Sequence, residues 1–412
     1  MQGIRSSFPS LGQIDGNARY LTAAGALVNF GAGYFIVARP VYLYAAGFDP
    51  TVIGVLIAVQ SFLGVILAIP IAMMSDIFGR KRFVVYGLLL DGIGSFLFFY
   101  STNLAALVAA QVLFAFVTAA ASSPFIALFM ESTNEDNRNG LFVILSFVGG
   151  IAMAMGSFGA GLPVVLERML GTDYLWGFRL IFLAVAITSL SSGAVVFRSV
   201  SEKPRAGSAM GSGGLSLSGL IKIPRKSMGV VKKFSIIGFT GFGAGLIIPL
   251  LPLWYNLKFG VDVSIIGPLF GSIFLTTALA SLFTPAIARR RGNVFTIIAT
   301  ELSGVVLLVS VPLAPDYLSA GGIMVVRSTF ANMSSPIMQS FMMGLVHPDE
   351  RATASSMIQM FDSVPRAYAP AIGGYLLSVG LIDLPFYMTA VLYVVSITLF
   401  YFFFRRMEPT RS

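Results

Sequence analysis

The sequence contains no cysteine and only one histidine, His347, among its 412 residues. Disulfides and thiol chemistry are therefore excluded, and a zinc cluster or a Ser-His-Asp site lacks the histidines that it needs. No Gly-x-x-x-x-Gly-Lys-Ser/Thr segment is present, so ATP is not expected as a direct energy source. We expect neither an enzyme nor a bound metal or cofactor.

Charged residues are also scarce, since Asp, Glu, Lys and Arg make up 11% of the chain while hydrophobic residues make up 56%. A soluble chain carries about 25% charged residues. The apolar residues form long runs, and the alternation of apolar and polar residues that marks β-barrel strands is absent. The composition predicts an all-α integral membrane protein whose surroundings are a lipid bilayer.

Twelve apolar segments are long enough to be spanning helices. They cover about 20–45, 51–75, 83–102, 104–131, 140–166, 177–197, 234–257, 264–288, 294–314, 318–345, 352–380 and 382–404. The break between the sixth and seventh segments, 198–233, is rich in Gly, Ser, Lys and Arg, which is typical of a solvated linker. We predict an N-terminal six-helix bundle (1–197), a basic linker (198–233) and a C-terminal six-helix bundle (234–412).

The positions of the basic residues predict the orientation in the membrane. Most of the 27 lysines and arginines lie on one side if both termini and the linker share that side. By the positive-inside rule, that side is cytoplasmic, so we expect a multi-pass protein of the plasma membrane with both termini in the cytoplasm. The net charge of +9 then needs no nucleic-acid partner.

The two halves resemble each other in sequence. With one constant offset, "DPTVIG" (Asp49–Gly54) aligns with "DVSIIG" (Asp262–Gly267), and Gly79 aligns with Gly292. Two similar six-helix halves predict a pseudo-symmetric pair of bundles with a binding site at their interface. The alternative is an old duplication that is retained only for packing.

A cluster of charges, "DIFGRKR" (Asp76–Arg82), separates the second and third segments. In this layout it resembles the loop motif Gly-x-x-x-Asp-x-x-Gly-Arg-Lys/Arg-Lys/Arg of the major facilitator superfamily, although Ala72 replaces the first glycine. The resemblance covers nearly the whole chain. It implies that the protein moves a small-molecule solute by alternating access.

The same motif suggests a gate at the cytoplasmic rim. The gate candidates are Asp76, Gly79, Arg80 and Glu131. Charges at this rim bias one state when their partners exist only in that state, and the resemblance implies that these contacts belong to the outward-facing state. Arg80 is expected to pair with Glu131 at the end of the fourth segment. The alternative is a basic loop that only sets topology.

Polar residues inside the apolar segments are candidates for substrate binding, because charge within lipid is costly. Arg327 lies about 14 Å from the outer end of the tenth segment, and the resemblance implies that the first, fourth, seventh and tenth helices line the cavity. The substrate-binding candidates are Arg327, Arg39, Asn332, Gln339, Gln111 and Asn29. For Arg39, the alternative is a side chain that reaches to the outer surface.

Three embedded carboxylates are candidates for proton coupling, since desolvation allows a buried carboxyl to carry a proton. Asp362 is followed by Arg366 at a spacing that places both on one helix face, while Asp91 and Glu301 occupy similar depths in the two halves. The alternatives are a neutralised pair at a kink for Asp362 and Arg366, and satisfied structural carboxylates for Asp91 and Glu301.

The function that we predict is a secondary active transporter, expected to be a monomer, for a small organic solute. An anion is favoured by the embedded arginines, and a proton is the expected coupling ion. Two alternatives stay open. An exporter of drugs or lipids is suggested by the 36 phenylalanines and by "APAIGG" (Ala369–Gly374), and the other is a non-transporting membrane sensor.

Overall fold

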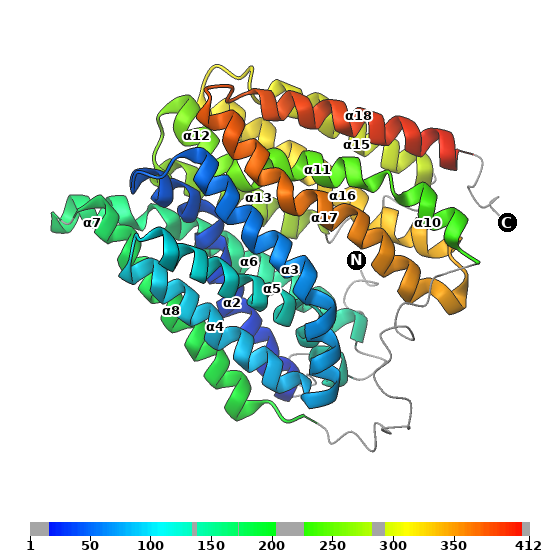
Figure 1. The fold of residues 1–412 in the computed structure, drawn as a ribbon, viewed down its shortest axis with the longest axis horizontal. Coiled ribbons are helices and arrows are strands. Elements are labelled where there is room, and N and C mark those ends of the chain that lie inside the picture. Colours follow the sequence, from blue (N-terminus) through cyan, green and yellow to red (C-terminus); the bar gives the residue numbers. More distant parts are fainter. Residues whose placement is uncertain (1–15, 134–137, 172, 203–225, 282–292, 406–412) are drawn as a thin grey trace, which may run out of the picture. The chain divides into compact units, whose positions relative to one another are not determined.

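The computed structural model describes residues 16–133, 138–171, 173–202, 226–281 and 293–405. Within these ranges nearly all of the backbone is helical and no strand is present (Figure 1). By length and composition, eight of the described helices can cross a membrane. The predicted class, an all-α membrane protein, is confirmed.

The first six predicted segments are all helical. They correspond to α2 (Gly16–Ala45), α3 (Pro50–Phe78), α4 (Arg80–Tyr100), α5 (Leu104–Glu131), α6 (Arg138–Phe158) continued by η2 (Gly159–Gly161) and α7 (Leu162–Leu170), and α8 (Tyr174–Ser199). The fifth segment therefore extends beyond its predicted end at 166. Gly171 then ends α7 with a left-handed conformation, φ 62°, which a glycine adopts without strain.

The last six predicted segments are helical wherever they are described. They correspond to α10 (Met228–Phe234), α11 (Ile237–Ile247), η3 (Ile248–Leu250) and α12 (Leu251–Phe259) for the seventh, then α13 (Val263–Ser281), α15 (Asn293–Ser310), α16 (Tyr317–Leu345), α17 (Arg351–Ser378) and α18 (Leu384–Phe404). Pro249 and Pro252 accompany the interruption between α11 and α12. Proline has no N–H to donate, so the regular helix is interrupted there.

The chain divides into two compact units. The first unit comprises 1–48, 59–206 and 261–278, and the second comprises 49–58, 207–260 and 279–412. In the first unit, α4 packs against α5 and α8, while α2 packs against α6 and α8. In the second, α11 packs against α17 and α18, and α15 packs against α16 and α18.

The segment that joins α8 to α10 lies largely outside the described residues, so the predicted division at 197 and 233 stays a prediction. The seventh helical segment begins earlier than expected, because α10 starts at Met228. Glu350 accepts hydrogen bonds from the Lys226 and Ser227 amides, at 3.1 and 2.8 Å. These bonds satisfy amides at the start of α10 that have no partner within the helix. We call the end of each unit nearest this segment its linker end.

The internal repeat is visible in local structure. Asp49 accepts a hydrogen bond from the Thr51 amide, and Asp262 accepts one from the Ser264 amide, both at 2.8 Å. The glycine that closes each hexapeptide packs on a backbone carbonyl. In the second unit Gly54 of α3 lies on the Pro370 oxygen, and in the first unit Gly267 of α13 lies on the Ser157 oxygen. Gly54 and Gly267 are aligned in the repeat, so the two units share this glycine–carbonyl contact.

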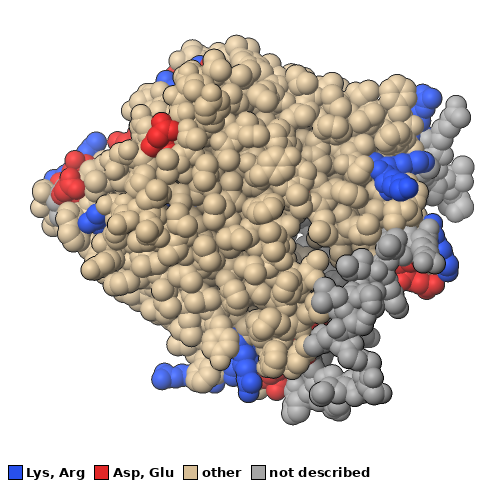
Figure 2. All heavy atoms as spheres, in the orientation of Figure 1, with Lys and Arg blue, Asp and Glu red and all other residues tan. Residues whose placement is uncertain are grey.

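Charged side chains are unevenly distributed on the protein surface. On the face shown in Figure 2, lysines, arginines and acidic residues gather near its margins, and a broad uncharged surface separates them. Many large apolar side chains, such as Ile66, Phe197 and Phe402, are exposed on the helices. Apolar side chains on this scale are unusual on a soluble monomer and suit a surface that faces lipid.

Candidate functional site

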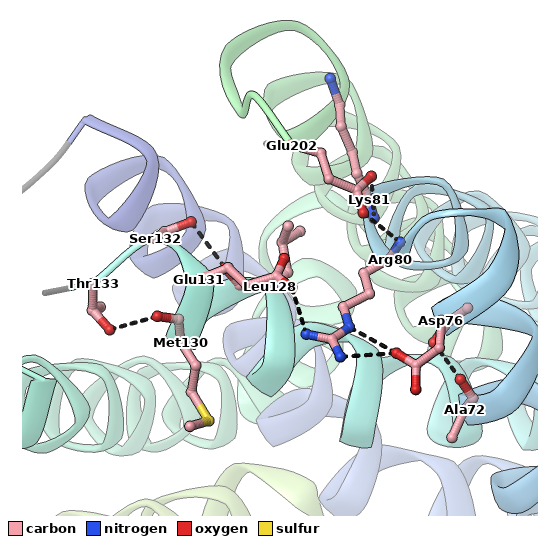
Figure 3. Close-up of polar contacts among 11 residues, drawn as sticks. Ala72, Asp76, Arg80, Lys81, Leu128, Met130, Glu131, Ser132, Thr133 and Glu202 are labelled. Atoms are coloured by element: carbon pink, nitrogen blue, oxygen red, sulfur yellow. Dashed lines mark hydrogen bonds and ion pairs between the residues drawn. The ribbon is translucent and has the colours of Figure 1, made fainter. Parts of the chain in front are cut away.

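A charged cluster occupies the linker end of the first unit, where α3, α4 and α5 meet (Figure 3). Asp76 lies in the last turn of α3, and Arg80 begins α4. The Arg80 guanidinium contacts an Asp76 oxygen through both Nε, at 2.9 Å, and Nη2, at 2.8 Å. Its Nη1 donates to Glu131, the last residue of α5, at 2.8 Å. Arg80 therefore joins the ends of three helices.

Gly79 connects α3 to α4 with φ 103°, a conformation that residues with a Cβ rarely adopt. A Cβ at this position would also lie 3.0 Å from the Glu202 carboxylate. Glu202, which follows α8, accepts hydrogen bonds from the Arg80 amide at 2.8 Å and the Lys81 amide at 3.4 Å (Figure 3). The glycine thus allows both the turn and the approach of a carboxylate to the start of α4, where anions are favoured.

Arg39 lies on α2, where it forms a second polar cluster in the first unit. Its Nη1 donates to the side-chain oxygens of Gln60 on α3 and Gln111 on α5, the latter at 3.2 Å. Gln111 is fully buried. The side chain of Arg39 therefore lies between three helices, and does not simply extend to the outer surface.

Arg327 of α16 is buried in the second unit, with 5% of its surface exposed. Its guanidinium carbon lies 6.0 Å from the centre of the Tyr393 ring on α18, within the range of a cation–π contact. Its Nε has no hydrogen-bond partner. Within the described residues, no ion pair or hydrogen bond to this guanidinium is present, so the charge is buried without an anion.

Asp362 and Arg366 of α17 form an ion pair within one helix turn. Arg366 donates through Nε at 3.0 Å and through Nη2 at 2.8 Å to the two oxygens of Asp362. Tyr393 also lies within electrostatic reach of Arg366. Arg366 therefore has a carboxylate partner, whereas Arg327 has none within the described residues.

Comparison with known proteins identifies the family. A model of the Major Facilitator Superfamily matches residues 21–370 and 234–412. The chain belongs to the Major Facilitator Superfamily. An uncharacterized transporter of Buchnera aphidicola subsp. Schizaphis graminum (strain Sg) is 24% identical over 155 residues, which are 38% of this chain and 37% of that protein. The chain thus matches little more than a third of that relative's length.

Similar solved structures belong to transporters of this fold. A mutant of the nucleoside transporter NupG has a TM-score of 0.75 and 14% identity, covering 94% of this chain and 99% of its own. A bacterial homologue of the human lysosomal transporter Spinster, in an inward-facing and occupied conformation, has a TM-score of 0.72 and 16% identity, covering 96% and 98%. At this identity the likeness shows the fold, which is that of twelve spanning helices.

Asp91 and Glu301, two of the proton-coupling candidates in this superfamily member, have different surroundings. Asp91 accepts a hydrogen bond from Ser189 at 2.6 Å where α4 packs on α8. Within the described residues, the Glu301 side chain on α15 forms no hydrogen bond or ion pair. Ser189 therefore supports a structural role for Asp91, while Glu301 has no such partner.

The other uncharged candidates for substrate binding, Asn29, Asn332 and Gln339, do not join a cluster of charged side chains. Asn29 donates to the Gly25 carbonyl of its own helix at 2.8 Å and lies against Gly149 of α6. Asn332 donates to the Ser328 carbonyl, also at 2.8 Å, and is exposed, as is Gln339. Their roles in substrate binding stay predictions. No group of three His, Cys, Asp or Glu residues suited to a metal was found in the part of the chain that is described.

Glu202 and Gln60 complete clusters for which sequence reasoning named only some members. Glu202 is the first acidic residue after the sixth segment, and the exposed amides at the start of α4 are the signal that could have indicated it. Gln60 is a polar residue within an apolar segment, which made it a candidate for lining a cavity but did not indicate its partner. The structure assigns it a partner, Arg39, which is 21 residues away in sequence.

Proposed function

We propose that this chain is a secondary transporter that moves a small organic anion across the cytoplasmic membrane by alternating access. The proposal depends mainly on the burial of the Arg327 guanidinium without a carboxylate partner among the described residues. A buried guanidinium is costly unless an anion compensates it. Arg80 and Arg366 each have a carboxylate partner in the structure, whereas Arg327 has none among the described residues. A substrate carboxylate or phosphate would supply the missing charge.

The position of Arg327 supports this assignment. It lies ten residues after Tyr317, so it is about 15 Å from the start of α16. That depth is close to the middle of a bilayer core of about 30 Å, where superfamily substrates are expected to bind between inverted or parallel repeats. A charge at such depth is by default a functional residue.

We further propose that proton transfer at Asp362 couples to transport. Protonation of this carboxyl would remove the charge that holds Arg366. The freed guanidinium could then interact with Tyr393 or with a substrate anion. Asp91 and Glu301 are secondary candidates, and the pair at Asp362 is preferred because its protonation changes the state of a neighbouring arginine.

The experiment that tests the function is uptake by proteoliposomes. Purified protein would be tested with labelled mono- and dicarboxylates and organic phosphates, and with neutral nucleosides for comparison, because one similar structure is a nucleoside transporter. We expect saturable uptake of at least one anion that an inward proton gradient accelerates. Saturable uptake of neutral solutes alone would contradict the anion assignment, and uptake insensitive to the gradient would contradict proton coupling.

The cluster at Arg80 is proposed to close the linker end of the first unit in one transport state. The linker end is proposed to face the cytoplasm. Arg80 holds α3, α4 and α5 together, but the side chains of Asp76 and Glu131 are 57% and 34% exposed. Exposed ion pairs contribute about 1 kcal/mol or less. Such a contact is suited to biasing a balance between states and is too weak to hold the fold by itself.

Asp76→Asn is therefore expected to leave the fold intact and to shift the conformational balance toward opening at the linker end. A loss of about 1 kcal/mol corresponds to a shift of about fivefold. Because the chain has no cysteine, a single cysteine in place of Ser132, which is buried next to Glu131, reports access to a maleimide at this cluster. We expect labelling to be about fivefold faster in the variant. Unchanged labelling would contradict the gate, and the alternative that this charged cluster is a basic loop that only sets topology would remain.

A further inference from the structure

The Arg39 cluster has hydrogen-bond donors in excess. Arginine carries only donors, so Gln60 and Gln111 must turn their side-chain oxygens toward Arg39. The amide nitrogen of Gln111 consequently points elsewhere, and it is buried with no partner. Both glutamine oxygens bind the same nitrogen, Nη1. The other edge of the guanidinium therefore has no glutamine oxygen bound to it.

That remaining edge consists of Nε and Nη2. The Arg39 Nε is buried with no hydrogen-bond partner, and the hydrogen bonds that Arg39 forms with described residues both use Nη1 and leave Nη2 free of one. These two N–H groups lie side by side in the guanidinium plane and match the two oxygens of a carboxylate or phosphate. The Arg39 guanidinium carbon lies over the face of the Phe35 ring, 5.9 Å from the ring centre. The unpaired N–H groups of Nε and Nη2 are therefore the ones available to an anion.

The charge is not compensated by the protein itself. The two glutamine oxygens orient Arg39 but are neutral, and no acidic side chain pairs with it in the part of the chain that is described. Arg39 lies six residues before the end of α2, and Gln111 lies seven residues after the start of α5. Arg39 and Gln111 are thus about 9 and 10.5 Å from the corresponding helix ends, within the apolar layer.

We infer that Arg39, Gln60 and Gln111 form a second anion subsite, in which the Nε–Nη2 edge of Arg39 binds a carboxylate or phosphate group while the two glutamines hold Nη1. The inference rests on the proposed transport of an organic anion for its biological role. All three residues of the subsite belong to the first unit, so its variants leave Arg327, which belongs to the second unit, unchanged. The glutamines hold Nη1 so that the binding edge is oriented before the anion arrives.

The subsite is tested by thermal unfolding of the purified protein in detergent, with acetate or inorganic phosphate compared with chloride at equal ionic strength. Bound anion stabilises the folded protein in proportion to its affinity and concentration. We expect acetate, phosphate or both to raise the melting temperature of the wild type. In Arg39→Lys, which keeps the charge but loses the two-pronged edge, we expect the apparent affinity to be about tenfold weaker.

Gln111→Glu provides the sharper variant, because it places a carboxylate beside Arg39 inside the protein. The anion-dependent shift should be lost, while the melting temperature without added anion should equal or exceed that of the wild type. Gln359→Glu, at an exposed position of α17, adds the same charge elsewhere and should keep the shift. This pair separates occupation of the subsite from a general effect of charge or a failure to fold.

Three results would overturn the inference. One is a wild type that neither anion stabilises, and another is a full anion shift that persists in both Arg39→Lys and Gln111→Glu. The third is stabilisation by phosphatidylglycerol in nanodiscs but by neither soluble anion, which would make the Arg39 partner a lipid headgroup. None of these results depends on an uptake assay, so failure of the subsite is distinguishable from failure of the proposed transport.

Discussion

Arg327→Ala is expected to abolish saturable uptake of the transported anion, with a loss of about 100-fold or more in transport efficiency. If the buried guanidinium pairs with the substrate anion, its removal leaves that anion without a partner in an apolar site. Breaking a buried ion pair in this way costs about 3–5 kcal/mol. The measurement is initial uptake rate against substrate concentration in proteoliposomes that contain equal amounts of wild type and variant.

The stability of the same variant distinguishes binding from a structural role. Arg327 has no ion pair among the described residues, so its removal takes away a buried charge and breaks no internal salt bridge. We expect the melting temperature of Arg327→Ala to equal or exceed that of the wild type without substrate. A variant that loses both stability and uptake would mean that the arginine supports the fold.

Arg327→Lys is the matched control for charge. Lysine keeps the positive charge but presents it as a point, without the planar fork that binds two oxygens. Uptake should fall to an intermediate level, mainly through weaker apparent affinity. Full uptake by Arg327→Ala would contradict the assignment outright, whatever the behaviour of the lysine variant.

The helices and the charged turn were predictable because each has a local signal. Apolar runs of spanning length indicated the helices, and the charged motif Asp76–Arg82 indicated where the second segment gives way to the third, which is where the structure has Gly79 with a positive φ. The sequence also indicated the contact between Arg80 and Glu131, since both lie at helix ends on one predicted side. Signals of this kind do not require knowledge of how helices rotate against each other.

Partners across helices were harder to predict. A helix that is apolar on all sides gives no indication of which face meets a neighbour, so the rotation of α2, α3 and α5 is not encoded in a simple pattern. The association of Arg39 with Gln60 and Gln111 depends on that rotation. For the same reason, the sequence did not predict that Tyr393 lies beside Arg327.

A third partnership between helices that the sequence did not predict lies in the second unit, at the end opposite its linker end. Asp383 precedes α18 and accepts hydrogen bonds from the Trp254 indole, at 3.0 Å, and from Lys258 of α12. In the sequence, Lys258 follows an apolar segment, and no local pattern links it to Asp383. Its partner is more than a hundred residues away in sequence, and only packing of α12 on α18 brings the two together.

The prolines of α17 account for the close approach of α11 to carbonyl groups of α17. A proline has no N–H, so Pro365 and Pro370 leave the carbonyls of the residues four positions earlier, Phe361 and Arg366, without their usual helical donors. Glycines of α11 approach both carbonyls, Gly238 at Phe361 and Gly245 at Arg366. A glycine Cα–H can approach a carbonyl closely and form a weak hydrogen bond.

Gly245→Ala is therefore expected to destabilise the second unit strongly. A Cβ at this position would overlap the Arg366 carbonyl oxygen and would lie 2.8 Å from the Ala369 Cβ. Neither atom can move by a change of rotamer, so α11 and α17 would have to separate. Overpacking of this kind costs about 3 kcal/mol, and we expect the melting temperature in detergent to fall by roughly 5 °C or more.

Gly322→Ala is the matched control, since Gly322 lies within α16 with no heavy atom within 4 Å of a built Cβ. There the alanine should stabilise the helix by about 0.5–1 kcal/mol, because glycine loses more backbone entropy on folding. The two substitutions are chemically identical, so opposite shifts in melting temperature would isolate the contact between α11 and α17. Equal shifts would show that the close approach at Gly245 contributes nothing to stability, and the carbonyls freed by Pro365 and Pro370 would then need another donor.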